Sequence, residues 1–342
     1  MQDAGSTSEI YPLRFHPVYR DYIWGGTRII SAYHRAAPPG IYAESWEIST
    51  RPDGRSIAAN GVWAGRPLTE IIEAWGPRLL GRRAPSDRPD VPLLIKLIDS
   101  RERLSVQVHP DNAAAARYGG EAKTEMWYIL DTAPGARVFA GLRPGADRRA
   151  FEEALRRGDL ESVLESVPVA PGDVIYVPGG RVHAIDAGCL LLEVQQNSDT
   201  TYRIYDWGRV GHDGRPRQTH LAEALRILRW RDTDPVKYTP VPLPAAPPNF
   251  REDVLVCPFF RMERWRLRTP ATLLPDAESF VAVFVARGVV IAAWDGGRET
   301  WNAGVTALIP SALPRIELAP GSGGATLLLT RLGDEGGVAP AG

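Results

Sequence analysis

Three side chains that can bind a metal ion or line a polar cavity follow one another along residues 104–109. If these residues form a β-strand, Ser105, Gln107 and His109 point to the same face, because side chains in a strand alternate with a period of two. Such a polar triplet does not face an apolar core. It indicates either a solvent-facing strand or the lining of a cavity.

Two later segments add side chains of the same kind. Lys123 and Glu125 share one face of a second strand, and His183 begins a strand that follows the Pro-Gly-Gly turn at 178–180. Each of these residues alone is typical of a solvated or structural position. Two histidines and a carboxylate on the inner faces of adjacent strands, however, are a common set for a transition metal with open coordination positions. Gln107 can add an oxygen ligand, and neutral imidazoles with an ionised carboxylate can bind Zn²⁺ at pH 7.

The elements that position these residues are mostly short strands. The chain has 33 glycines and 30 prolines, which separate segments rich in Val, Ile, Tyr and Trp. This pattern predicts an all-β fold, an antiparallel sandwich or barrel, rather than a doubly wound α/β fold. Helical periodicity is confined to a few stretches, which are 68–81, 147–158, 159–167 and 219–230.

A proline-rich segment separates two parts of the chain. Residues 232–249 contain six prolines and should be extended, with few hydrogen-bond donors. We therefore expect a metal-binding domain with a helical insertion at 10–232, a linker at 233–249 and a second β domain at 250–336. All six histidines precede the linker, so the second domain should lack metal ligands.

Composition limits the classes of partner. The chain has 342 residues, and 40 Lys and Arg nearly balance 41 Asp and Glu, which leaves a net charge of −1. This balance favours neither nucleic acid nor an anionic membrane as a partner. The two cysteines cannot form a disulfide framework and should be buried thiols. Because the sequence has no apolar run of about 18 residues and no signal-peptide pattern, we expect a cytoplasmic protein without membrane contact.

The spacing of the motifs resembles that of a known superfamily. Residues 172–183 follow the pattern Gly-x5-Pro-x-Gly-x2-His of the second cupin motif, although Ala187 stands where the final Asn is usual. Gln107-x-His109 with Glu125 resembles a modified first cupin motif. Together with HPDN, KTEM and NSDTTYRIYDWGR, these segments resemble the zinc-dependent mannose-6-phosphate isomerases in their shorter bacterial form. The resemblance implies a cupin barrel (a double-stranded β-helix or jelly roll) and a second, degenerate cupin-like β domain.

The resemblance also implies a role for each site residue. In the family, one zinc ion per chain is held by a Gln, two His and a Glu, which correspond here to Gln107, His109, Glu125 and His183. An Arg and a Lys are treated as catalytic, and they correspond to Arg203 and Lys123. Four further positions bind substrate in the family; they correspond to Lys96 and Ser105 at the phosphate and to Trp24 and Glu44 in the pocket lining.

The implied reaction uses these residue types. Conversion of mannose 6-phosphate to fructose 6-phosphate moves a proton between C2 and C1 through an enediol, and the developing negative charge needs a fixed positive partner. Zn²⁺ and Arg203 can supply that charge. A base must also act near pH 7. Lys123 is one candidate and the carboxylate of Glu44 is the other.

Two other functions fit parts of the pattern. A cupin oxygenase would bind Fe²⁺ through two histidines and a carboxylate, but it has no need of a phosphate clamp. A non-catalytic sugar-phosphate-binding cupin could retain the metal without turnover. In each sugar-phosphate hypothesis the partner is a small hexose phosphate, and we expect a monomer or a homodimer.

Overall fold

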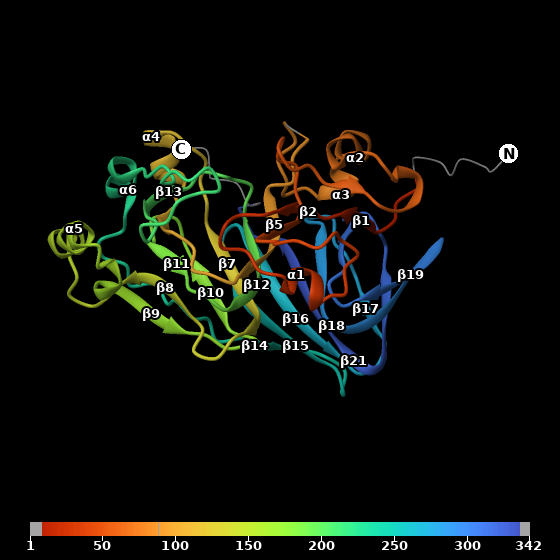
Figure 1. Cartoon of the computed structure of the whole chain (residues 1–342). Coiled ribbons are helices and arrows are strands. Elements are labelled where there is room, and N and C mark those ends of the chain that lie inside the picture. Colours follow the sequence, from red (N-terminus) through yellow and green to blue (C-terminus); the bar gives the residue numbers. More distant parts are fainter. Residues whose placement is uncertain (1–8, 88, 336–342) are drawn as a thin grey trace. The chain divides into compact units, whose positions relative to one another are not determined.

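The structure, a computed structural model, describes residues 9–87 and 89–335 (Figure 1). These residues form two compact units, and the chain passes between the units after residues 18, 45, 95 and 238. Unit 1 comprises residues 9–18, 46–95 and 239–335, and unit 2 comprises 19–45 and 96–238. Every site residue predicted from the sequence belongs to unit 2.

This division differs from the domain boundaries predicted from the sequence. The sequence groups 10–232 together, whereas 9–18 and 46–95 cluster with the C-terminal strands. The physical reason is strand pairing over a long sequence distance, since Leu13 is the register partner of Leu308. Such pairing leaves no local signal in the sequence.

Two antiparallel sheets form unit 2, although strands β2, β3 and β5 each have residues in unit 1. The six-stranded sheet has the order β10 (Val174–Val177), β7 (Glu125–Thr132), β12 (Cys189–Gln196), β5 (Leu93–Ser100), β3 (Glu44–Ile48) and β2 (Val18–Arg20). The five-stranded sheet has the order β13 (Tyr202–Tyr205), β6 (Val106–Val108), β11 (His183–Ile185), β8 (Arg137–Leu142) and β9 (Leu164–Pro168). Two short helices, α1 (Arg28–Ser31) and α4 (Asn112–Tyr118), lie in the connections.

Alternation along the strands decides which side chains face the space between these two sheets. Trp127 and Ile129 of the six-stranded sheet share one apolar cluster with Val138 and Ile185 of the five-stranded sheet. Because side chains alternate with a period of two, Glu125 faces this interior with Trp127, and His183 faces it with Ile185. The predicted faces of these two strands are thereby confirmed.

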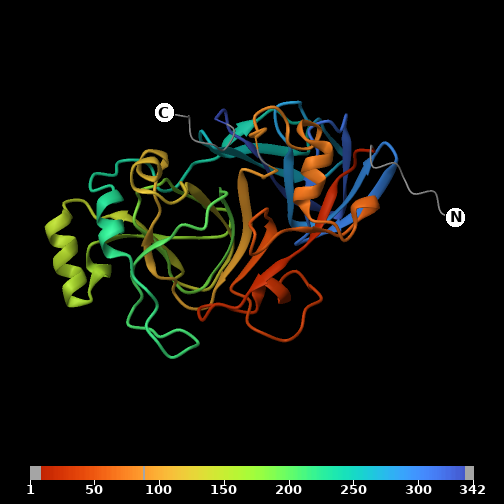
Figure 2. The same ribbon diagram turned by 90° about the horizontal axis from the view of Figure 1, so that it is seen from above.

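Two helices cover the opposite face of the five-stranded sheet. They are α5 (Arg148–Arg157) and α6 (Leu221–Ile227), which lie next to each other in Figure 2. Phe151 and Ala154 of α5 and Ala224 of α6 belong to the same apolar cluster as Val106. The predicted helix at 147–158 is confirmed, including its aspartate N-cap and its left-handed terminal glycine.

The predicted helix at 159–167 is wrong. Only Leu160–Ser162 form a 3-10 turn, and residues Leu164–Pro168 form β9 instead. In β9, Val167 pairs with Val138 of β8. Sheet pairing therefore outweighs the local helical periodicity of this segment.

Unit 1 is built on a large antiparallel sheet with an apolar core that contains Trp265 and Trp301. The main path of the sheet is β14 (Val241–Leu243), β15 (Phe250–Val256), β16 (Phe260–Leu267), β21 (Ile316–Leu332), β18 (Val281–Trp294), β20 (Thr306–Ile309), β1 (Leu13–His16) and β4 (Ile57–Ala58). β17 (Ala271–Leu273) pairs with β21, and β19 (Gly297–Asn302) pairs with β18. A 3-10 turn (Gly61–Trp63) precedes α2 (Leu68–Trp75) and α3 (Pro77–Leu80), so the helix predicted at 68–81 is interrupted by Gly76.

The proline-rich segment is ordered against both units rather than free. Residues 236–238 bond to β10 of unit 2, and Val241–Leu243 pair with β15 of unit 1. Both cysteines are free and buried, as predicted. Among the described residues, no helix is both long and apolar enough to cross a membrane.

Candidate metal centre and active site

Three metal-binding side chains meet between the two sheets of unit 2. Ligand atoms of His109, Glu125 and His183 all lie within 4.8 Å of one another, and all three residues are buried. Nε2 of His109 is 3.5 Å from Oε2 of Glu125, and Nε2 of His183 is 3.3 Å from Oε1 of the same carboxylate. The joint prediction from three separate sequence segments thus corresponds to one cluster.

Strand register brings these residues together. His183 is the first residue of β11 and lies directly opposite Gln107 of β6. His109 follows the end of β6, and Glu125 is the first residue of β7. Each ligand therefore stands at or next to a strand end, where a rigid sheet orients it and the chain leaves room beside it.

The two imidazoles are held in the same tautomer. Nδ1 of His109 donates to the backbone carbonyl of Thr200 at 2.9 Å, and Nδ1 of His183 donates to that of Arg181 at 2.9 Å. Because a carbonyl oxygen only accepts, each Nδ1 must carry the proton, and each Nε2 keeps a lone pair. Both lone pairs then belong to the nitrogens that face Glu125. Such outer hydrogen bonds commonly orient metal-binding histidines.

Burial sets the charge states in the cluster. It lowers the pKa of His183 to about 3 and the pKa of His109 well below its usual value. Both imidazoles are therefore neutral at pH 7, as metal binding requires. Burial also raises the pKa of Glu125 to about 7, against the opposing effect of the nearby Lys123.

The donor set fits a transition-metal ion. Among the described residues, neither oxygen of Glu125 has a hydrogen bond of good geometry, although Nζ of Lys123 is 3.0 Å from Oε2. Buried carboxylate oxygens rarely lack a hydrogen-bond donor or a cation as a partner. A cation between Glu125 and the two Nε2 lone pairs would supply that partner. Two nitrogens and an oxygen suit zinc and its neighbours in the periodic table rather than magnesium or calcium.

Gln107 lies beside this cluster, with its nitrogen facing it. Nε2 of Gln107 is 3.2 Å from Nε2 of His183, while its Oε1 accepts a hydrogen bond of 3.4 Å from the hydroxyl of Ser105. An amide binds a metal through its oxygen. Rotation of the amide by 180° would exchange the two atoms, because the two groups have nearly the same shape.

Lys123 contacts both the carboxylate and one imidazole. Its Nζ is 3.0 Å from Oε2 of Glu125 and 3.2 Å from Nε2 of His109. The side chain is almost fully buried. A proton on this amine is therefore adjacent to the candidate metal position.

Lys96 is the centre of a second buried charge cluster. Its Nζ is 3.6 Å from Glu44 and 3.3 Å from Glu193. Burial lowers the pKa of Lys96, but the two carboxylates outweigh this effect and raise the pKa above its usual value. Trp127 also donates its indole N–H to Glu193 at 3.0 Å. The sequence analysis missed Glu193, whose signal is a single carboxylate in an otherwise apolar strand, CLLLEV.

Arg203 stands on β13, directly opposite Gln107 of β6. Its Nη1 donates to the carbonyl of Gln218 at 2.8 Å, while its buried Nε has no hydrogen-bond partner in the described part of the chain. Burial and the neighbouring Arg217 lower the pKa of Arg203. Arg217 itself is paired with Asp206. Arg209 binds Asp206 as well, so two guanidinium groups share this carboxylate, and Arg203 interacts with all three groups through charge.

Trp24 is placed in the apolar core rather than in direct contact with the ligand cluster. It is 3 % exposed and packs in the cluster that contains Trp127. The edge of the Trp127 ring lies against His183, with ring centroids 5.6 Å apart. Trp24 and Trp127 thus belong to one apolar cluster, and Trp127 reaches the candidate centre.

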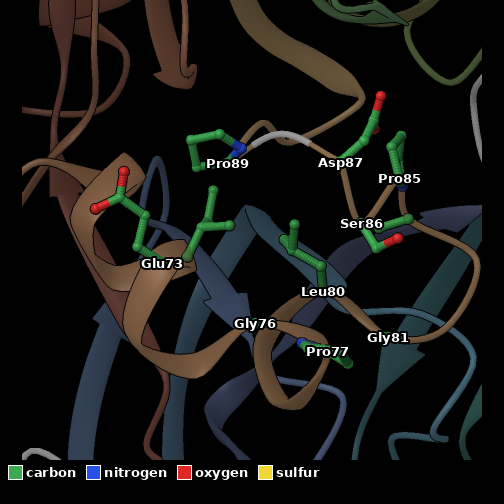
Figure 3. Close-up of a pocket in the computed structure, with 11 residues that line it drawn as sticks. Glu73, Gly76, Pro77, Leu80, Gly81, Pro85, Ser86, Asp87 and Pro89 are labelled. Carbon is green, nitrogen blue, oxygen red and sulfur yellow. The ribbon is translucent and has the colours of Figure 1, made fainter.

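A separate pocket of about 300 Å³ lies in unit 1, beside α2, α3, residues 84–87 and Pro89 (Figure 3). Its lining is mostly apolar, and the carboxylates of Glu73 and Asp87 lie on opposite sides of it in Figure 3. None of the described lining residues is a histidine or a cysteine. The pocket therefore shares no residue and no chemistry with the metal-ligand cluster.

Comparisons with known proteins agree with this geometry. The model of the type I phosphomannose isomerase catalytic domain matches residues 13–135. The chain is 37% identical to a mannose-6-phosphate isomerase of Streptococcus mutans over 258 residues. This alignment covers 75% of this chain and 79% of the relative. It is 35% identical to mannose-6-phosphate isomerase ManA of Bacillus subtilis over 279 residues, an alignment that covers 81% of this chain and 86% of the relative.

A solved structure extends the comparison to the fold. The crystal structure of a Bacillus subtilis mannose 6-phosphate isomerase matches with a TM-score of 0.85 and 30% identity, over 93% of this chain and 99% of that one. A putative mannosephosphate isomerase from Archaeoglobus fulgidus, 19% identical, shares the fold with a TM-score of 0.76. The predicted all-β cupin fold with few helices is thereby confirmed. The chain belongs to the mannose-6-phosphate isomerase family.

Proposed function

We propose that the chain interconverts mannose 6-phosphate and fructose 6-phosphate through an enediol at the cluster of His109, Glu125 and His183. The observation that carries the proposal is the pair of buried imidazoles with matching tautomers, whose Nε2 lone pairs converge on one carboxylate. Family membership supports the substrate and the type of reaction.

We infer that the metal is one Zn²⁺ per chain. His109, Glu125 and His183 would hold it, and Gln107 would be the fourth ligand after its amide rotates. When bound, the ion supplies positive charge for oxygens that become negative during the reaction. Unlike magnesium and calcium, zinc accepts nitrogen ligands readily, which favours it here.

Two residues of the chain would act on the substrate. Arg203, which keeps a buried guanidinium N–H without a partner among the described residues, would donate to the enediolate oxygens. Lys123 would move the proton between C2 and C1. The competing base is Glu44, which is 3.6 Å from the ammonium of Lys96; Lys123 lies beside the metal ligands, 3.2 Å from His109, and this supports Lys123.

The phosphate has two candidate binding groups. The family resemblance assigns it to Lys96 and Ser105, but Lys96 already has two carboxylates as partners. The arginine cluster formed by Arg203, Arg209 and Arg217 has three positive groups for one carboxylate, and a phosphate dianion would balance that excess. If Lys96 binds the phosphate, Lys96→Met raises KM for the phosphorylated sugar more than Arg217→Met does. The opposite order assigns the phosphate to the arginines.

A coupled assay of fructose 6-phosphate formation tests the proposal. We expect turnover that a chelator abolishes and Zn²⁺ restores. His183→Ala should lose metal and activity together. His212 is exposed, so His212→Ala is the matched control and should keep both. Arg203→Ala should keep zinc but lose turnover by orders of magnitude. A folded, zinc-loaded protein without turnover would contradict the proposal.

The same preparation separates the two alternatives. Iron in place of zinc, together with O₂ consumption, would identify an oxygenase. Tight binding of mannose 6-phosphate without turnover would identify a sugar-phosphate-binding protein. The cytoplasmic location and the monomeric or homodimeric state stay predictions, which fractionation of cells and analytical ultracentrifugation can test.

A further inference from the structure

The guanidinium of Arg181 is buried and bonds to the segment that follows α6 and to β10. Its Nε and Nη2 contact the two carboxylate oxygens of Asp232 at 2.5 and 2.9 Å. Its Nη1 donates to the carbonyl of Tyr176 at 2.7 Å, and its Nη2 donates to that of Asp234 at 2.7 Å. The residue is 1 % exposed. So many bonds to one buried arginine define the position of both the arginine and its partners.

The same segment continues along the edge of the six-stranded sheet, where Lys237 forms an isolated β-bridge with Ile175. The amide of Tyr176 in β10 donates to the carbonyl of Val236 at 2.9 Å, and the amide of Tyr238 donates to the carbonyl of Val174 at 3.1 Å. At the outer end Lys237 pairs with Asp173 at 2.7 Å. Residues 232–238, which we call the docked segment, thus cover the β10 edge of the sheet.

The turn that carries Arg181 also contacts both candidate histidine ligands. The carbonyl of Arg181 accepts the Nδ1 proton of His183, and the amide of Gly180 donates to the carbonyl of His109 at 2.7 Å. Gly180 has a φ of 87°, and a Cβ there would lie 2.6 Å from Cγ of Arg229. The turn is therefore closely confined between the histidines on one side and the chain after α6 on the other.

From these contacts we propose that Arg181 is a positioning residue for His183, and that docking of residues 232–238 is coupled to metal binding. The inference rests on the proposed metal centre. Displacing the docked segment would leave the Arg181 guanidinium buried without its carboxylate, so the turn would shift. The carbonyl that fixes the His183 tautomer would move with it. By reciprocity, metal binding would stabilise the docked segment.

Hydrogen exchange of the unaltered protein tests the coupling from the metal side. Amide exchange is measured with and without Zn²⁺ after the metal has been removed by a chelator. We expect zinc to slow exchange of the Tyr176 and Tyr238 amides, which bond across the docked segment. The amide of Arg28, which donates to Asp99 at 2.7 Å, is the control and should be unaffected. Unchanged exchange at Tyr176 and Tyr238 in zinc-loaded protein would overturn the coupling.

A pair of matched variants tests it from the other side. Asp232→Asn removes the charge that Arg181 binds, and Asp99→Asn removes a buried carboxylate charge from its pair with the partly exposed Arg28. We expect both variants to lower the melting temperature. Only Asp232→Asn should weaken zinc binding, by about tenfold, as removal of outer-shell partners of metal ligands commonly does.

The outcomes separate this inference from the proposed function. Equal zinc affinity in the two variants would show that Arg181 acts on stability alone and would overturn the inference, while the metal centre would stand. A parent protein that binds no zinc would overturn the metal centre and the coupling together. Zinc affinity is measured by competition with a chromophoric chelator, so neither result depends on enzyme activity.

Discussion

Zinc binding should depend on pH through one proton, which belongs to Glu125. Burial raises the pKa of this carboxyl to about 7 in the metal-free cluster, so protons compete with the metal below neutral pH. The two imidazoles do not compete between pH 5 and 8. Burial lowers the pKa of His183 to about 3 and holds the pKa of His109 far below its usual value. A solvent-exposed site with the same ligands would lose affinity through its histidines near pH 6.5.

The size of the effect follows from the fraction of Glu125 that is ionised. With a pKa of about 7, the apparent Kd for zinc doubles at pH 7 relative to its limit at high pH. It rises about 11-fold at pH 6 and about 100-fold at pH 5, which corresponds to about 1.4 kcal/mol per pH unit. The zinc affinity is therefore close to its maximum above pH 8. Below pH 7 the apparent Kd rises about tenfold for each pH unit, because one proton competes with the metal.

Two substitutions should move this midpoint in opposite directions. Lys123 lowers the pKa of Glu125, so Lys123→Met should shift the midpoint to higher pH. Glu193 raises the pKa of Glu125 by charge repulsion, so Glu193→Gln should shift it to lower pH. Chelator competition between pH 5.5 and 8.5 measures all three proteins. A slope of two protons, a flat profile, or shifts of the same sign in both variants would refute the reasoning.

Three further perturbations test the fold of the two units. Phe151→Ala should lower the free energy of unfolding by about 3–5 kcal/mol in a urea titration, because the ring is fully buried between α5 and the five-stranded sheet. Burial raises the pKa of Asp206, but its arginine partners outweigh this and hold the pKa below 3.8. The destabilisation caused by Asp206→Asn should therefore be full above about pH 4 and shrink as the pH falls through the folded-state pKa; a constant difference would contradict this. Gly81→Ala should lower the melting temperature more than Gly65→Ala does. Both glycines have a positive φ, 84° and 83°, but only at Gly81 would a Cβ collide with backbone, 2.4 Å from Glu278.

Local sequence patterns were sufficient to predict much of the cluster. The period of two along a strand places Glu125 on the interior face, with Trp127 beyond it. The same rule places Gln107 and His183 on that face, and antiparallel register makes them direct neighbours. These predictions needed only the alternation of side chains within each strand and the assumption that the strands form a barrel with a polar interior.

Contacts between distant strands could not be predicted in this way. Lys96 was assigned to the substrate phosphate, but β12 places Glu193 next to it, and that register is set by the whole sheet. Likewise, the six prolines of 232–249 predicted an extended chain, and within it Val241–Leu243 form a strand. They did not indicate that Asp232 would be the partner of a buried arginine. Sequence composition describes the conformation of such a segment but not the surface that it covers.

The alternating path of the chain between the two units has a consequence for synthesis on the ribosome. Unit 1 begins first, but it is completed only by the strands after residue 238, whereas unit 2 is complete once residue 238 has been made. The unit with the metal ligands can therefore fold while residues 9–18 and most of 46–95 still await their partners in the other unit, a reversal of the usual N-terminal-first order. A translational pause after residue 238 would leave a finished catalytic unit beside two exposed, aggregation-prone segments, and chaperone binding during synthesis should concentrate on those segments.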